Sequence, residues 1–231
     1  MAAPACSNAE RGRASIRAVV PARGLRWCAP AAATVAVVLA VVGGARWPAY
    51  RHRSQFLSEL GQRGAPDGAA VSAGFVSIGA LLAGSAVHGE GRFRHRPPAR
   101  AGVLAVTLGF AVSYAAAGAA RCDPGCPERG RISTSQAVHN AAGAAGYFAA
   151  AGGMGIAGWA LRRSPHRGVA GAGLVGAPVA AVLSALMASE SNAADRGLLQ
   201  RIVEVVVFGW MIAAVRRPGS EATPPPLRSA S

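Results

Sequence analysis

The fold is decided by long apolar stretches, and the first of them is residues 29–45, APAAATVAVVLAVVGGA. This stretch contains no charged residue and lies between Trp27 and Trp47. The amphipathic ring of tryptophan favours the membrane–water interface, and roughly 20 apolar residues in an α-helix cross about 30 Å of hydrocarbon. Residues 29–45 therefore predict a membrane-spanning helix with one tryptophan near each interface.

A cleaved signal peptide is the alternative interpretation of this stretch. The arginine-rich N-terminus resembles the start of a signal peptide, and Gly43-Gly44-Ala45 resembles a cleavage site. However, the apolar run is longer than the usual signal-peptide core and begins far from Met1. A retained first span is the preferred prediction.

Five further apolar stretches of spanning length follow the first. The six cover about residues 29–45, 69–87, 101–120, 137–161, 168–188 and 198–215. With 52% hydrophobic residues and a mean hydropathy of +0.30, the chain is too apolar for an ordinary soluble domain. The sequence predicts an all-α polytopic membrane bundle of six transmembrane helices over residues 27–217, between a basic tail at 1–26 and a tail at 218–231, both disordered.

The arginines are divided unequally between the two sides of this predicted bundle. The two tails and the loops after the second and fourth helices hold 15 arginines and 3 acidic residues, whereas the other three loops hold 8 arginines and 6 acidic residues. The positive-inside rule places the arginine-rich side in the cytoplasm. We therefore predict a multi-pass protein of the plasma membrane with both termini cytoplasmic.

The net charge of +14 would suggest nucleic-acid binding in a soluble protein. Here the arginines lie in short segments between apolar stretches, with no basic helix face and no interleaved aromatic residues. Such segments are typical of contacts with anionic lipid headgroups. The predicted partner is the lipid bilayer, and nucleic acid is excluded.

Polar residues collect on the predicted outer side of the membrane. The loop before the second helix contains Ser58-Glu59-Leu60-Gly61, and Asp67 is suited to cap the helix that follows, so a turn with a helix cap is the ordinary interpretation. His139 lies at the outer start of the fourth helix. A lone histidine near a helix end is more often structural than catalytic.

Cys122 and Cys126 flank a Pro-Gly turn in the loop before the fourth helix. On the oxidising side of a membrane this spacing favours a small disulfide-closed loop over a metal site or free thiols. The rest of the chain has no second cysteine pair with the usual spacing of a zinc site, because Cys6 and Cys28 lie on the other side. No metal and no cofactor is therefore predicted.

Arg201 and Glu204 lie three residues apart on one face of the predicted sixth helix. A charge inside a span costs on the order of a few kcal/mol, so such residues face the bundle interior or a watery cavity. Two interpretations stay open. The residues form an Arg–Glu bridge that orients the helix, or one or both reach an outward-open polar site.

Three segments, taken in order, resemble a known family. They are Ser58-Glu59-Leu60-Gly61, the loop Cys122-Asp123-Pro124-Gly125-Cys126-Pro127 followed by His139, and Gly197-Leu198-Leu199-Gln200-Arg201. Over about residues 27–217 the chain resembles the bacterial six-pass membrane family catalogued as domain of unknown function 998. That family is distantly similar to the Frag1/DRAM/Sfk1-type six-pass proteins of eukaryotes, which are associated with lipid and membrane-trafficking roles.

The resemblance implies fold and topology, since no activity is assigned to the family. It also marks positions that match the family pattern, which are Ser58, Glu59, Gly61, Cys122, Asp123, Cys126, His139 and Arg201. Our predicted topology places all of them at or near the outer surface. The predicted outward-facing site consists of Ser58, Glu59, Gly61, Asp123, His139, Arg201 and Glu204.

Three classes of function compete for this site. The first is binding of a lipid headgroup, an anionic small molecule or a protein partner, with Arg201 as the anion clamp. The second is an extracytoplasmic lipid hydrolase or transferase with Glu59, Asp123 or His139 as general base or metal ligand. The third is a transporter, which would need more polar residues near the midplane. Because no nucleophile elbow, paired-histidine metal motif or phosphate loop occurs, we predict binding rather than catalysis.

Overall fold

The computed structural model describes residues 22–216, which form helices and loops and, within that range, no strand. The first long helix, Cys28–Arg46, is continuous through α2 (Cys28–Val38), a π-helical turn (Leu39–Gly43) and α3 (Gly44–Arg46). The other long helices are α4 (Gly68–Arg92), α5 (Pro97–Ala119), α6 (Thr134–Leu161), α7 (Arg167–Met187) and α8 (Arg196–Arg216). The short elements are α1 (Ala22–Leu25) and the 3-10 turns Leu57–Gly61 and Glu190–Asn192.

Each of the six predicted apolar stretches coincides with one long helix. Five of these helices in the described chain are long and apolar enough to cross a membrane, namely Cys28–Arg46, α4, α5, α7 and α8 up to Val215. The exception is α6, because its 28 residues include six glycines and begin with Gln136, His139 and Asn140. α8 is among the five although it contains the charged residues Arg201 and Glu204. These helices imply lipid bilayer surroundings.

The predicted tails fall mostly outside the described residues. This holds for residues 1–21 and for the whole segment 218–231. Within the predicted N-terminal tail, Ala22–Leu25 form the short helix α1. Asp67 occupies the N-cap position of α4, but its side chain makes no capping hydrogen bond and pairs with Arg46 at 2.7 Å instead.

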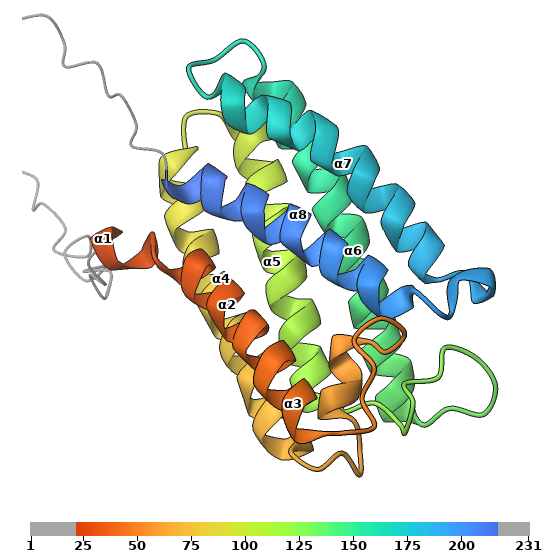
Figure 1. Ribbon diagram of the computed structural model, residues 1–231. Coiled ribbons are helices and arrows are strands. Elements are labelled where there is room, and N and C mark those ends of the chain that lie inside the picture. The colour runs from red at the N-terminus through yellow and green to blue at the C-terminus, as the bar shows by residue number, and fades with distance from the viewer. Residues whose placement is uncertain (1–21, 217–231) are drawn as a thin grey trace, which may run out of the picture.

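The long helices run back and forth and pack as neighbours in chain order (Figure 1). α5 packs between α4 and α6, and α7 packs between α6 and α8. α8 closes the bundle by contacting α2, α4 and α5 as well. The core lies along these contacts and contains large side chains such as Phe75, Phe110 and Met211.

Small residues allow α5 and α6 to approach closely. A Cβ atom added at Gly102 would lie 2.5 Å from the carbonyl oxygen of Gly153, and one added at Gly153 would lie 2.6 Å from the carbonyl oxygen of Gly102. Between apolar helices in lipid, close backbone approach supplies the packing energy that the hydrophobic effect cannot supply. The two glycines therefore fix the separation of α5 and α6.

Three loops gather at one end of the bundle, at the lower right of Figure 1. We call this the loop-rich end and define it by residues 47–67, 120–133 and 188–195. Ion pairs tie the loops to one another, and they join Arg53 to Asp195, Arg63 to Asp123, and Arg129 to Glu190. At the opposite end, the His88 ring lies 3.3 Å from the Val215 carbonyl oxygen. The candidate residues lie either in these loops or within about two turns of the helix ends that adjoin them.

Candidate functional site

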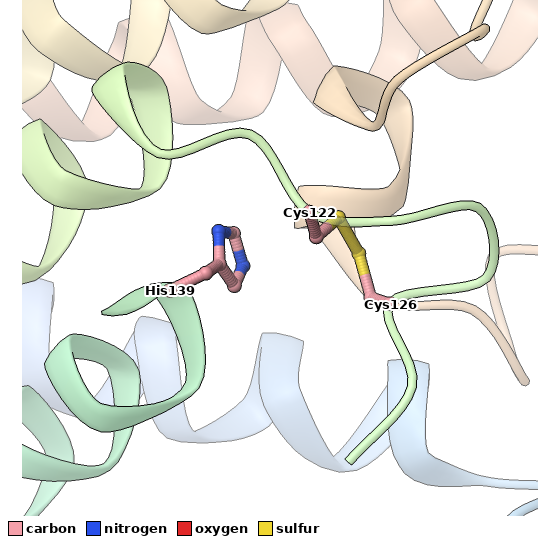
Figure 2. Close-up of side chains that lie close together, drawn as sticks. All are labelled: Cys122, Cys126 and His139. Carbon is pink, nitrogen blue, oxygen red and sulfur yellow. A yellow bond between two sulfur atoms is a disulfide. The ribbon is translucent and has the colours of Figure 1, made fainter. Parts of the chain in front are cut away.

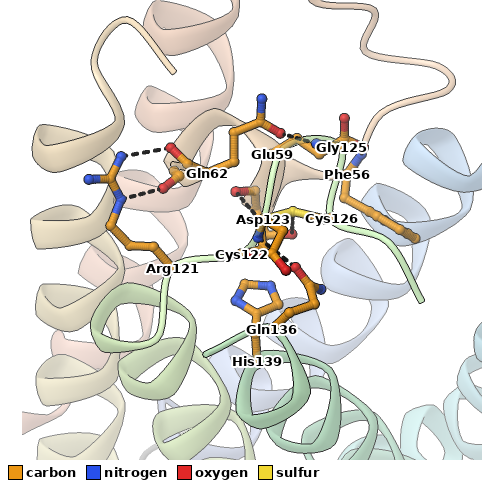
Figure 3. The surroundings of a disulfide bond; sticks show 12 residues. Phe56, Glu59, Gln62, Arg121, Cys122, Asp123, Gly125, Cys126, Gln136 and His139 are labelled. Atoms are coloured by element: carbon orange, nitrogen blue, oxygen red, sulfur yellow. Dashed lines mark hydrogen bonds between the residues drawn. A yellow bond between two sulfur atoms is a disulfide. The ribbon is translucent and has the colours of Figure 1, made fainter. Parts of the chain in front are cut away.

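The predicted disulfide between Cys122 and Cys126 is present, with Cα atoms 5.1 Å apart (Figure 3). Both cysteines are buried. Gly125 has a φ of +79°, which glycine adopts without steric cost, and its N–H donates to Gln62 at 2.6 Å. The disulfide thus closes a tight turn that is docked onto the loop containing Gln62.

Asp123 organises the start of α6. Its carboxylate accepts hydrogen bonds from the backbone N–H and the hydroxyl of Ser133, both at 2.9 Å, and it pairs with Arg63. The Ser133 hydroxyl in turn accepts from the N–H of Gln136 at 3.1 Å as the N-cap of α6. Both carboxylate oxygens of Asp123 are thereby engaged within the protein.

Glu59 organises the 3-10 turn Leu57–Gly61 in a similar way. Its buried carboxylate accepts from the backbone N–H of Phe56 at 2.9 Å and from Gln55 at 2.8 Å. It also pairs with Arg196 at 3.4 Å. Gly61 follows in the same turn, and its carbonyl oxygen accepts from Arg121 at 2.8 Å. These contacts are internal to the loop-rich end.

Arg201 and Glu204 point to different partners. The Arg201 guanidinium donates to the Tyr50 hydroxyl at 2.6 Å and to the carbonyl oxygens of Gly197 at 2.7 Å and Gln55 at 3.2 Å. Glu204 accepts from the Tyr114 hydroxyl at 3.0 Å in the bundle interior. Among the described residues no ion pair joins the two side chains. Arg201 therefore fastens the loop at Tyr50 to α8, and Glu204 faces inward.

Tyr50 is the main partner of Arg201 outside the helices. Its hydroxyl donates to the Phe56 carbonyl oxygen at 2.9 Å. Burial raises the pKa of Tyr50 to about 12, although the charge of Arg201 and its hydrogen bond oppose this rise. The neutral phenol can thus donate to Phe56 and accept from Arg201 at the same time.

A cavity of about 340 Å³ lies between α6 and α7 at the loop-rich end. We call it the wedge cavity. Its apolar lining includes Phe56, Phe148, Ala181, Ala185 and Met187, and its polar lining includes Ser58, Glu128, His139, Asn140, Tyr147, Ser184 and Gln200. The Phe148 side chain is 76% exposed, so the cavity opens at the outer surface of the helices.

A second cavity of about 60 Å³ lies deeper in the bundle, and we call it the inner cavity. This volume is enough for a few water molecules. It is lined by Glu204, Tyr114, Phe110 and Ser113 together with five residues shared with the wedge cavity, which are Ser58, His139, Gly143, Tyr147 and Gln200. Gln200 donates to the Tyr147 hydroxyl at 3.1 Å and accepts from the Leu57 N–H at 2.7 Å, so this wall is hydrogen-bonded.

The cavities divide the predicted site residues into two groups. Ser58 and His139 line both cavities, and Glu204 lines the inner cavity. Glu59, Gly61, Asp123 and Arg201 line neither of these cavities and bond to the loops. Sequence reasoning missed Tyr147 and Gln200 as site residues. Polar side chains within predicted spans are the signal that marks them.

Three side chains in this region offer donor atoms to a metal ion. They are Cys122, Cys126 and His139, whose ligand atoms lie within 4.8 Å of one another (Figure 2). The Nδ1 atom of His139 lies 3.0 Å from the Ala120 carbonyl oxygen. Since a carbonyl oxygen only accepts, Nδ1 carries the proton in this contact.

Comparison with known proteins gives one match. No curated protein and no solved structure matches the chain. Residues 30–217 match the family described as "Protein of unknown function (DUF998)". The distant similarity to Frag1/DRAM/Sfk1-type proteins and the bacterial origin stay predictions. Because the match covers most of the chain, the protein belongs to the DUF998 family.

Proposed function

We propose that the protein crosses the membrane six times and binds one amphiphile, a lipid or lipid-like molecule, in the wedge cavity. The topology rests on the alternating direction of six long helices (Figure 1). At 1.5 Å per residue, the 28 residues of α6 extend about 42 Å, which exceeds the hydrocarbon thickness of about 30 Å. The arginine distribution supports cytoplasmic termini and an outer loop-rich end in the plasma membrane.

The wedge cavity is the observation that carries the binding proposal. Its volume of about 340 Å³ and its largely apolar lining with a few polar groups are typical of small-molecule sites. The exposed ring of Phe148 lies on the surface that faces lipid in this topology. An acyl chain can therefore enter from the bilayer between α6 and α7, while a polar group reaches the loop-rich end.

The polar lining favours an uncharged headgroup with hydroxyl or amide groups. Asn140, Tyr147 and Gln200 supply neutral donors and acceptors. In the described chain, the lining contains one carboxylate, Glu128, and no arginine. The guanidinium of Arg201, the predicted anion clamp, is bound to protein oxygens. This lining supports a neutral headgroup more strongly than an anionic one.

Binding is favoured over a lipid hydrolase or transferase. Glu59 and Asp123 are held in loop contacts and line neither of the two cavities, so they are poorly placed to act as general bases. His139 lines both cavities, but its Nδ1 is bonded to a backbone carbonyl. A transporter is also less favoured, because the inner cavity has room for only a few water molecules.

Filling the cavity tests the binding proposal. Gly143 lines the wedge cavity and Gly152 does not, yet a Cβ added at either glycine of α6 meets no atom within 4 Å. In vesicles containing a diazirine-bearing diacylglycerol, the natural chain and Gly152→Leu should be labelled within α6 and α7. Gly143→Leu should be labelled about tenfold less, equivalent to about 1.4 kcal/mol of binding energy.

A matched probe tests the headgroup class. Phosphatidic acid with the same diazirine chain differs from the diacylglycerol only by its phosphate, and it should label the cavity less. Preferential labelling by phosphatidic acid would show that the headgroup is anionic. If each probe labels Gly143→Leu as strongly as Gly152→Leu, the cavity does not bind amphiphiles.

A further inference from the structure

The three donor residues at the loop-rich end meet from two different elements. Cys122 and Cys126 lie in the loop before α6, and His139 lies in the second turn of α6. Their exposed fractions are 0%, 3% and 8%, so the cluster is withdrawn from solvent. Two cysteines and one histidine are a typical ligand set for zinc, which prefers thiolate and imidazole donors.

The histidine is oriented as a metal ligand. Its Nδ1–H donates to the Ala120 carbonyl oxygen at 3.0 Å, which leaves the lone pair of Nε2 free in the neutral ring. Figure 2 shows this second nitrogen on the side of the ring that faces the two sulfurs. A backbone carbonyl that holds the distal N–H is the usual support of a metal-binding histidine.

We propose that Cys122, Cys126 and His139 bind one zinc ion when the two cysteines are reduced, and that the disulfide is the metal-free state of the same site. Tetrahedral zinc with bonds of about 2.0–2.3 Å places its ligand atoms roughly 3.5–3.8 Å apart. The three ligand atoms already lie within 4.8 Å of one another. Opening the S–S bond and a shift of about 1 Å would form the site.

The charge of the loaded site suits its burial. Two thiolates and one neutral imidazole balance the charge of Zn²⁺, so no net charge is buried. The fourth position is available to the Ser58 hydroxyl, which lies 3.7 Å from the Cys126 sulfur, or to water from the adjoining cavities. The site does not depend on amphiphile binding, although His139 and Cys126 also line the wedge cavity.

The two states interconvert by a balanced reaction. A phosphine reductant breaks the S–S bond and takes the oxygen of one water to become a phosphine oxide, and each sulfur leaves as a thiol. Zinc binding then forms two Zn–S bonds and one Zn–N bond and releases both thiol protons. In the oxidised chain neither sulfur is a thiolate, so zinc affinity is lost.

Cobalt titration of the purified full chain in detergent tests the proposal, with Co²⁺ as the spectroscopic probe. The reference chain carries Cys6→Ser and Cys28→Ser, so that Cys122 and Cys126 are its only cysteines. After phosphine reduction and its removal under nitrogen, this chain should bind one Co²⁺ with a thiolate-to-cobalt charge-transfer band. The oxidised chain should show no band.

Ligand variants identify the donors. Cys122→Ser and Cys126→Ser should remove the tight site, and His139→Ala should weaken Co²⁺ binding more than about 100-fold, beyond the effect of losing a supporting hydrogen bond. Since His139→Ala also removes the contact with Ala120, X-ray absorption of the zinc-loaded reference chain provides a test without that variant. It should count two sulfurs and one imidazole nitrogen.

The proposal fails if the reduced reference chain binds no Co²⁺, if the oxidised chain binds it equally well, or if the absorption spectrum lacks the imidazole nitrogen. Unchanged affinity in a folded His139→Ala chain would also overturn it. The titration contains no lipid probe. Its failure therefore leaves the amphiphile-binding proposal untouched, and failure of lipid labelling leaves the zinc site untouched.

Discussion

At the scale of single residues, the loop-rich end uses its charges to fix loops onto helices. Arg201 joins α8 to Tyr50 and to the carbonyl oxygen of Gln55, which is 146 residues away in the chain. Glu59 likewise joins the 3-10 turn Leu57–Gly61 to Arg196. Such partly buried, charge-assisted hydrogen bonds are costly to break because the remaining partners stay at least partly desolvated. These residues are therefore expected to contribute to stability more than to ligand binding.

Arg201→Met should lower the free energy of unfolding by about 2 kcal/mol, because three hydrogen bonds from a guanidinium are lost. Labelling of the wedge cavity by the diacylglycerol probe should be unchanged in the folded variant. Thermal unfolding of the full chain in detergent measures the first effect. Arg53→Met is the control, since the exposed, solvent-screened Arg53–Asp195 pair should contribute little to stability. Loss of phosphatidic acid labelling without loss of stability would restore Arg201 as an anion clamp.

Tyr50 predicts a specific pH dependence of stability. Its folded-state pKa of about 12 lies above the ordinary value of 10.0, so the folded chain holds the phenol proton more tightly than the unfolded chain. This contribution is fully present below pH 10 and is lost as the pH rises through about 12. It amounts to at most about 3 kcal/mol. As the pH rises from 10 to about 12, the free energy of unfolding should therefore fall less in Tyr50→Phe than in the natural chain. Identical pH profiles of the two chains would contradict this explanation.

At the scale of elements, the helices are positioned by small residues and by caps. The N-cap Ser133 and its partner Asp123 fix where α6 begins, and this start places His139 beside the disulfide. The pair Gly102 and Gly153 then fixes how closely α5 and α6 pack. The wedge cavity lies on the other side of α6, where that helix faces α7.

Gly102→Ala should destabilise the bundle by about 1–3 kcal/mol, because the added methyl group would lie 2.5 Å from a carbonyl oxygen of α6 and the helices must separate. Gly171→Ala is the matched control in α7, since no atom lies within 4 Å of its added Cβ. Thermal unfolding of both variants in the same detergent measures the difference. Equal midpoints would show that α5 and α6 are not held by this contact.

At the scale of the whole molecule, the described bundle carries the loops, the disulfide and both cavities at one end, whereas most arginines of the sequence fall in the segments predicted to be cytoplasmic. This polarity predicts which face of the membrane each end occupies. An oxidising outer face also agrees with the disulfide at the loop-rich end. The proposed zinc site would then form only where a reductant reaches that face.

Reporter cysteines at the two ends test this orientation. In a Cys6→Ser, Cys28→Ser background, Ser191→Cys places a thiol on the exposed loop 188–195, and Arg94→Cys places one at the opposite end. A membrane-impermeant maleimide should label Ser191→Cys in intact cells and Arg94→Cys only after permeabilisation. The reverse pattern would mean an inverted protein. Labelling of both in intact cells would rule out an odd number of spans between them.

The sequence by itself determined the positions of the six long helices and the disulfide, because both depend on local properties of the chain. Apolar runs of spanning length form helices wherever they pack, and Cys122 and Cys126 are close in sequence. The glycine content of α6, which lowers its apolar character, is likewise a local property of the sequence.

Only the tertiary structure decided which polar residues reach a cavity. Arg201 and Glu204 share a helix face in the sequence pattern, yet one turns to Tyr50 in a distant loop and the other to Tyr114 on α5. Glu59 and Asp123 are taken up by loop contacts, whereas Ser58 and His139 are left lining both cavities. The direction of each side chain depends on long-range partners and on the rotation of each packed helix, and neither is encoded in local spacing.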